Sequence, residues 1–213
     1  YKSYLMIKKK PIFWVKAKKY LKKKDHKLGK IIDSYPRDFL FSKSEPFITL
    51  ARSIVGQQIS VKAAQSVWDK LVCKIGKINP TIIKKTHPNA LKSVGLSRQK
   101  VLYLKNLADA FLNNRVKINL WKKMNDEEVI NDLIQIKGIG RWTAEMFLIF
   151  NLCRPDIFPF DDVGAIKGLC KCYSIKYPTD NDTLLEIINK WRPYRSVATW
   201  YLWRSLDPIP VEY

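Results

Sequence analysis

Residues 133–168 constrain the fold of this chain more than any other stretch. An apolar segment ends in the sequence K-G-I-G at 137–140, and a second apolar segment begins at Arg141. Two glycines with one residue between them allow the backbone to adopt positive φ or to approach another group closely. The first N–H groups of a helix have no partner within the helix, and they attract an anion such as a phosphate. The pattern predicts two helices joined by a short phosphate-holding turn, with the apolar Ile139 pointing inward.

The charge of the chain favours a polyanionic partner. There are 39 Lys and Arg residues against 19 Asp and Glu residues, which gives a net charge of +20. Such an excess is typical of nucleic-acid-binding proteins. Only nine of the 39 basic residues are Arg, and Lys, Ile and Asn are abundant, so part of the excess reflects overall composition. The charge therefore supports a nucleic-acid partner without establishing one.

A Pro-containing loop after the second apolar segment carries two adjacent carboxylates, Asp161 and Asp162, about twenty residues beyond the turn. Turn, loop and aspartate together resemble the helix-hairpin-helix DNA glycosylase superfamily, known as HhH-GPD. Within it, the sequence G-I-G-R-W-T-A at 138–144 resembles the branch of 3-methyladenine DNA glycosylase II. The stretch F-I-T-L-A-R-S-I-V-G-Q-Q-I-S-V-K-A-A at 47–64 resembles the same branch, and the resemblance covers about residues 45–206.

Apolar residues recur at helical spacing along the chain and no strand pattern is present, so an all-α fold is predicted. One helix is expected over about residues 18–33. Ser60 and Ser97 are expected to cap helices, and Asn125 with Glu128 is expected to form a capping box.

The resemblance implies a two-lobed arrangement. A helical barrel lobe is expected at 45–158 and contains the helix-hairpin-helix at about 133–151. The second helical lobe is expected to combine 1–44 with 159–213. The cleft between the lobes is expected to receive the damaged nucleotide.

The reaction implied by the resemblance is hydrolysis of the bond between a damaged base and deoxyribose. Positive charge builds on the sugar in its oxocarbenium-like transition state, and a nearby carboxylate stabilises that charge. In the superfamily the catalytic aspartate opens a helix and is followed five residues later by a basic residue, which selects Asp162 through Lys167. The tightest family spacing from Pro159 would select Asp161 instead. A third interpretation is that both carboxylates only cap helices, since Asp is a preferred cap.

By the resemblance, Trp142, Trp203, Met146 and Val163 line the base pocket. Electron-rich rings bind a cationic alkylated base by stacking and cation–π attraction. Some relatives carry Tyr in place of Met146 and Val163, which leaves the breadth of substrates open. Relatives that also cut the strand have a nucleophilic lysine where this chain has Trp142, so a monofunctional enzyme without lyase activity is expected. Both tryptophans could alternatively fill the core.

The resemblance implies that the loop residue Gln58, with its neighbour Gln57, wedges into the duplex where the base has left. The alternative is that both glutamines only satisfy backbone groups of a turn. The expected contacts to the DNA backbone come from the hairpin residues Lys137, Gly138, Ile139, Gly140 and Arg141. Such contacts fix register but do not read base sequence. The resemblance also implies a monovalent cation held by backbone carbonyls of the hairpin.

No resident cofactor is expected. The four cysteines are Cys73, Cys153, Cys170 and Cys172. Such a low number favours a reducing compartment. Nothing after Cys172 could complete the C-terminal iron–sulfur cluster of some relatives, and Cys170-x-Cys172 is too close for a zinc pair. Neither a membrane-spanning stretch nor a secretory signal is evident. We expect a monomer that acts in the cytoplasm with the nucleoid if bacterial, or in the nucleus if eukaryotic.

The sequence thus predicts a monofunctional DNA glycosylase that releases alkylated purines, mainly 3-methyladenine and 7-methylguanine, from double-stranded DNA in base excision repair. The base must first be flipped out of the stack. Two alternatives stay open: a glycosylase for oxidised or deaminated bases, and a non-catalytic helix-hairpin-helix DNA-binding module.

Overall fold

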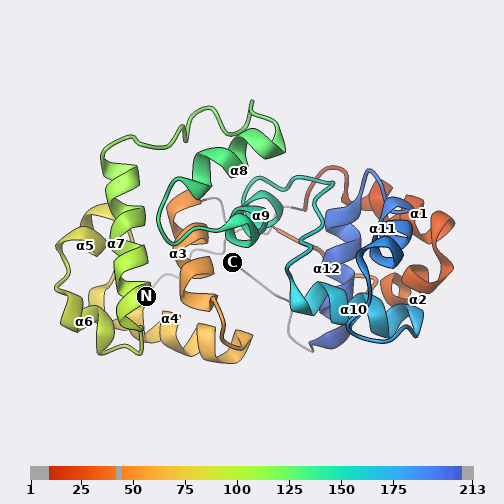
Figure 1. Cartoon of the computed structure of the whole chain (residues 1–213), viewed down its shortest axis with the longest axis horizontal. Coiled ribbons are helices and arrows are strands. Elements are labelled where there is room, and N and C mark those ends of the chain that lie inside the picture. Colours follow the sequence, from red (N-terminus) through yellow and green to blue (C-terminus); the bar gives the residue numbers. More distant parts are fainter. Residues whose placement is uncertain (1–9, 42–44, 208–213) are drawn as a thin grey trace. The chain divides into compact units, whose positions relative to one another are not determined.

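A computed structural model describes residues 10–41 and 45–207 of the chain. Over these residues all regular structure is helical, which confirms the all-α prediction (Figure 1). The twelve described helices are α1 (Trp14–Lys24), α2 (His26–Ser34), α3 (Pro46–Gly56), α4 (Val61–Ile75), α5 (Pro80–Lys85), α6 (Pro88–Lys92), α7 (Arg98–Leu112), α8 (Asp126–Ile134), α9 (Arg141–Phe150), α10 (Val163–Tyr173), α11 (Asn181–Asn189) and α12 (Arg195–Leu206). None of these helices is long and apolar enough to cross a membrane.

Several helices begin where the sequence predicts a cap. The Ser60 side chain caps α4, and the Ser97 side chain caps α7. Asn125 and Glu128 form the predicted capping box at the start of α8, each side chain accepting from the backbone N–H of the other. These caps satisfy N–H groups that would otherwise lack partners at a helix start.

The single helix predicted over residues 18–33 is wrong, because α1 and α2 are separated at Asp25. Asp25 has extended backbone and caps α2 by accepting from the Leu28 N–H (3.0 Å). Its other carboxylate oxygen accepts from the Trp191 indole N–H (2.8 Å) and from the Tyr173 hydroxyl. A buried carboxylate needs such donors, and Trp191 and Tyr173 lie far along the chain, so local periodicity could not reveal the break.

The described residues form two compact units, and each is described by itself. The unit that contains helices α3 to α9 comprises residues 45–151, hereafter the hairpin unit. Helix α3 packs against α4, α7 and α9, and α8 packs against α9. A chain of edge-to-face aromatic contacts runs through its core from Phe47 to Phe111, Trp121 and Phe147. The hairpin helices therefore pack against a well-packed apolar core.

The second unit comprises residues 10–41 with 152–207, hereafter the aspartate unit. Helix α12 lies against α1, α2 and α10 (Figure 1). Every residue from Ser196 to Trp203 is buried. A helix that is buried all round belongs to the core of its unit, so α12 is the central helix here.

The boundary between the units differs from the expected one at residue 158. Residues 152–158 belong with the aspartate unit. The Ile157 N–H donates to the Ser196 hydroxyl (2.8 Å), and the Phe158 ring lies 6.2 Å from the Trp191 ring. These are contacts to residues much later in the sequence, which the motif order alone does not indicate.

Candidate active site and nucleic-acid interface

The two adjacent carboxylates have different surroundings in the structure. Asp162 is half-buried and is the N-cap of α10, while Asp161 is exposed. Oδ1 of Asp162 accepts from the Ala165 backbone N–H (2.6 Å) and from the Trp203 indole N–H (2.8 Å). The positive end of the helix macrodipole also favours an anion at this place. The Asp162 carboxylate is therefore held in one orientation.

Two glycines bring α10 close enough to α12 for this hydrogen bond. A Cβ atom on Gly164 would lie 3.2 Å from Oδ1 of Asp162 and 3.2 Å from Cδ1 of Trp203. A Cβ atom on Gly168 would lie 2.9 Å from the carbonyl oxygen of Leu202. Residues four apart share one face of a helix. Because Gly164 and Gly168 leave this face of α10 without side chains, the Trp203 indole can reach the Asp162 carboxylate. Sequence reasoning missed both glycines, although their i, i+4 spacing after the aspartate was a usable signal.

The other predicted pocket residues are distributed over both units. In the aspartate unit, Trp203 is buried on α12, and Val163 is 52% exposed at the first position of α10. In the hairpin unit, Trp142 is half-buried in the first turn of α9, whereas Met146 is 1% exposed. A contact between Met146 and a base stays a prediction, and the described position of its side chain is in the core.

The predicted hairpin is formed by α8, the turn at 135–140 and α9. Ile139 is buried, as predicted from its place between the glycines, and Lys137 is exposed. Gly138 has a φ of +108°, and a Cβ atom there would lie 2.5 Å from Cβ of Tyr103. Gly140 is exposed and has a φ of −94°, and a Cβ atom there would meet nothing within 4 Å. Of the two glycines, only Gly140 thus offers open space for a close backbone approach.

Side chains from distant helices brace this turn. The Gln57 amide donates to the Gly138 carbonyl (3.0 Å) and to the Thr143 hydroxyl (3.1 Å). The Asn106 amide donates to the Lys137 carbonyl (3.2 Å). The implied monovalent cation would have to share these two carbonyl oxygens or use others, and it stays a prediction.

The two wedge candidates differ in the direction of their side chains. Gln57 is half-buried and turned to the hairpin, whereas Gln58 is exposed and has a φ of +59°. The end of α3, directly before these two residues, is held by Lys100, whose ammonium group donates to the Val55 carbonyl (2.7 Å). Burial lowers the pKa of Lys100. Of the two glutamines, Gln58 is the more exposed one, and its role as a wedge stays a prediction.

A polar recess of about 350 Å³ lies between the turn of Gln57 and Gln58 (hereafter the wedge turn, after its predicted role), the start of α7 and the hairpin. Its lining residues are Gln57, Gln58, Ser97, Gln99, Lys100, Tyr103, Gly138, Ile139 and Gly140. The exposed Gln58 and the open Gly140 therefore share one surface of the hairpin unit.

Arg141, predicted as a backbone contact, has carboxylate partners in its own unit. Its guanidinium group pairs with Glu127 and with the buried Glu145 (3.1 Å). The hydrogen bond from Arg141 lowers the pKa of Glu127. This network links the start of α8 to α9 and favours a structural role for Arg141.

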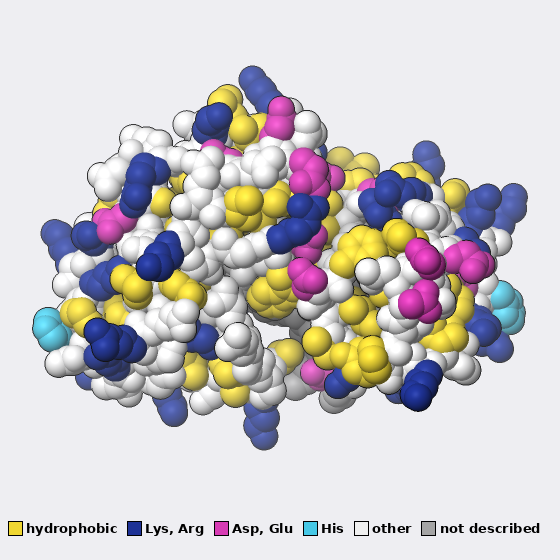
Figure 2. Space-filling view, in the orientation of Figure 1, with side chains coloured by type: hydrophobic (Ala, Val, Ile, Leu, Met, Phe, Trp, Pro, Cys, Tyr) yellow, Lys and Arg dark blue, Asp and Glu magenta, His cyan; other side chains and the backbone are white. Residues whose placement is uncertain are grey.

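On the face shown in Figure 2, charge does not locate a binding surface. In the view of Figure 2, Lys and Arg side chains are scattered over the visible surface rather than gathered in one patch. The four cysteines are free thiols. Among residues 10–41 and 45–207 no group of three or more His, Cys, Asp or Glu side chains is placed to hold a metal ion.

Comparison with known proteins places this chain in a class of base excision DNA repair proteins. The family model of the HhH-GPD superfamily base excision DNA repair protein matches residues 51–193. DNA-3-methyladenine glycosylase 1 of Schizosaccharomyces pombe is 33% identical over 184 residues, which cover 84% of this chain and 80% of that protein. DNA-3-methyladenine glycosylase of Saccharomyces cerevisiae is 34% identical over 194 residues, which cover 74% of this chain and 66% of that protein.

Solved structures agree with these sequence matches. The Schizosaccharomyces pombe 3-methyladenine DNA glycosylase in complex with abasic DNA matches with a TM-score of 0.80 and 30% identity, covering 89% of this chain and 96% of that one. A DNA-3-methyladenine glycosidase of Bacillus halodurans matches with a TM-score of 0.73 and 32% identity, covering 89% and 88%. The chain belongs to the HhH-GPD superfamily, and its relatives assign it to the 3-methyladenine glycosylase branch, as the sequence motifs predicted.

Proposed function

We propose that this protein is a monofunctional DNA glycosylase that hydrolyses the N-glycosidic bond of alkylated purines, mainly 3-methyladenine and 7-methylguanine, in double-stranded DNA. The observation that carries this proposal is the Asp162 carboxylate, oriented by a helix N-terminus and by the Trp203 indole N–H. Relatives named DNA-3-methyladenine glycosylase support the substrate class. A related structure that contains abasic DNA supports duplex DNA as the partner.

In the proposed reaction each unit has its own task. The hairpin unit holds the DNA backbone at the open Gly140, and Gln58 fills the space left by the flipped base. The aspartate unit supplies Asp162, whose negative charge stabilises the positive charge that develops on the sugar. The base leaves with the electrons of the broken glycosidic bond, which cancels the positive charge of an alkylated purine. Water then bonds to the sugar, and the proton that this water loses passes to the solvent.

An alkylated purine suits a site of this kind because it already carries positive charge and a weakened glycosidic bond. It therefore leaves without much help from a general acid, so one carboxylate suffices. Aromatic side chains such as Trp142 attract a cationic ring by stacking and cation–π interaction. A neutral oxidised or deaminated base would instead need specific hydrogen-bond donors.

Trp142 also determines whether the DNA strand is cut after the base is released. A bifunctional enzyme needs an amine at this helix position to attack the sugar and form a Schiff base. An indole cannot do so, and we propose an abasic site as the final product. Borohydride trapping tests this point, since a covalent adduct between protein and DNA would contradict it.

The central test compares Asp162→Asn with wild type and with Asp161→Asn, the matched control on the neighbouring exposed carboxylate. Release of 3-methyladenine and 7-methylguanine from methylated duplex DNA is measured under single-turnover conditions. We expect Asp162→Asn to slow release on the order of 10²- to 10³-fold and Asp161→Asn to behave like wild type. Wild type that binds the duplex but releases no base would identify a non-catalytic binding module instead.

A further inference from the structure

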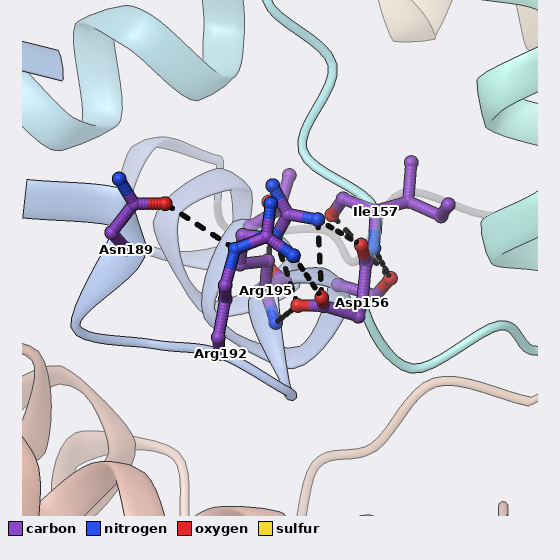
Figure 3. A network of polar contacts seen from close by, with 7 residues as sticks. Asp156, Ile157, Asn189, Arg192 and Arg195 are labelled. Atoms are coloured by element: carbon purple, nitrogen blue, oxygen red, sulfur yellow. Dashed lines mark hydrogen bonds and ion pairs between the residues drawn. The ribbon is translucent and has the colours of Figure 1, made fainter. Parts of the chain in front are cut away.

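The loop that leads to Asp162 is fastened to the start of α12 by a charged bracket, defined here as Asp156 with Arg195 (Figure 3). The Arg195 guanidinium group donates from Nε to Oδ1 of Asp156 (2.8 Å) and from Nη2 to Oδ2 (3.1 Å). Nη2 also donates to the Asp156 backbone carbonyl (2.7 Å), and the Arg195 backbone N–H donates to Oδ1 (3.2 Å). Arg195 is only 13% exposed in its side chain. Arg195 thus binds both the side chain and the backbone of Asp156.

Neighbouring contacts reinforce the bracket. The Ser196 N–H donates to the Pro155 carbonyl (3.0 Å), and the Ser196 hydroxyl accepts from the Ile157 N–H (2.8 Å). Three successive loop residues, 155–157, are therefore hydrogen-bonded to the first turn of α12. Arg192 reaches the same carboxylate from outside (3.0 Å), but its side chain is 54% exposed.

The bracket and Asp162 are attached to the same helix. Asp162 lies six residues after Asp156, and Trp203 lies eight residues after Arg195, which is about 12 Å along an α-helix. The loop begins at the Asp156 contact and ends where the Trp203 indole binds Asp162. It lies outside the helices, with one turn closed by the Asp162 N–H and the Pro159 carbonyl (3.1 Å). Between the two attachments, residues 157–159 are buried, so the bracket and the packing of these residues together set the path of the loop.

We propose that the Asp156–Arg195 bracket is a positioning device for the Asp162 carboxylate, and this role rests on the proposed function. A planar guanidinium fork fixes the angle as well as the distance of a carboxylate, which a lysine ammonium cannot do. Displacement of a reacting group by about 1 Å costs on the order of 10²-fold in rate. A bracket that sets the register of the loop therefore affects the chemical step without touching the DNA.

The test separates positioning from a purely structural role. Arg195→Lys and Asp156→Asn are measured against Arg192→Lys, the control that alters an exposed partner of the same carboxylate. The rate of base release at saturating enzyme, affinity for duplex with an abasic-site analogue, and urea unfolding are recorded for each. We expect both bracket variants to slow base release about 10-fold or more with unchanged DNA affinity, and Arg192→Lys to match wild type.

A second measurement uses the coupling between the two attachments of the loop. Each bracket variant is combined with Trp203→Phe, which removes the indole N–H and retains a ring. Because both groups act on one carboxylate, we expect the combined effect on rate to depart from the product of the single effects. Folded bracket variants with wild-type rates, or effects that simply multiply, would overturn the positioning role. Wild type that releases no base would instead overturn the proposed function.

Discussion

The same substitution should destabilise the protein at one hairpin glycine and leave its stability nearly unchanged at the other, which makes the pair the most direct test of the hairpin geometry. Gly138 has a φ of +108°, and an added Cβ atom would lie 2.5 Å from Cβ of Tyr103. A side chain in this backbone region costs about 1–3 kcal/mol, and crowding a packed ring costs about 1–3 kcal/mol more. Gly138→Ala should therefore lower the free energy of unfolding by about 2–6 kcal/mol.

Gly140 is the matched control. Its φ of −94° suits any residue, and no atom lies within 4 Å of the place a methyl group would occupy. Gly140→Ala should change the free energy of unfolding by less than about 1 kcal/mol. If the DNA backbone approaches this open position, the methyl group should weaken DNA binding although the fold is intact.

Unfolding in urea, followed by tryptophan fluorescence, gives the stability of each variant, and fluorescence anisotropy with labelled duplex at fixed salt gives its affinity. The cost of Gly138→Ala is then measured again in a Tyr103→Ala background. Tyr103→Ala removes the contacts with Cγ and Cδ1 of the ring, so the cost should shrink, while the backbone part of about 1–3 kcal/mol and the contact with Cβ of residue 103 stay. An equal cost in both backgrounds would refute the crowding argument. A stable Gly138→Ala protein, or an equally unstable Gly140→Ala protein, would refute the assignment of the two glycines.

Three further predictions concern the aspartate, the brace of the hairpin, and pH. Trp203→Phe removes the N–H that binds Asp162 and should slow single-turnover base release by about 10- to 100-fold, with a folded protein by circular dichroism. Gln57→Leu removes two hydrogen bonds from the hairpin and should lower the free energy of unfolding in urea by about 1–3 kcal/mol. Burial raises the pKa of the Cys153 and Cys172 thiols from 9.0 to about 11. In the unfolded chain these thiols ionise at a lower pH than in the folded protein. Their contribution to the free energy of unfolding is therefore fully present below pH 9 and is lost as the pH rises through 11. Urea titrations across this pH window should show the decline.

Features that depend on neighbours in the sequence could be predicted well. The caps at Ser60, Ser97 and Asn125 and the inward direction of Ile139 are set within a few residues of each position. The order of hairpin, loop and aspartate was sufficient to predict the family. In these cases the local hydrogen bonds and the apolar pattern already contain the relevant information.

Features that depend on packing between distant segments could not be predicted. Both hairpin glycines looked equivalent in the sequence, but Gly138 has positive φ and lies against the Tyr103 side chain from α7, whereas Gly140 does not. Both glutamines of the wedge turn also looked alike, yet only Gln57 binds the hairpin, 81 residues further along the chain. Each of these differences depends on a contact with a residue far along the chain, which the local sequence pattern does not identify.

One carboxylate of the adjacent pair should matter to the chemistry because of how it is held. Electrostatic stabilisation of a transition state is effective when the charged group is already oriented, because no reorganisation then accompanies the reaction. Asp162 is oriented by the first turn of α10 and by the indole of Trp203. In our proposal, the bracket of Asp156 and Arg195 sets the position at which the loop holds the Asp162 carboxylate. If orientation is what the aspartate unit contributes, then loosening any one of these attachments should slow bond cleavage without changing which base is released, because base selection depends on other side chains.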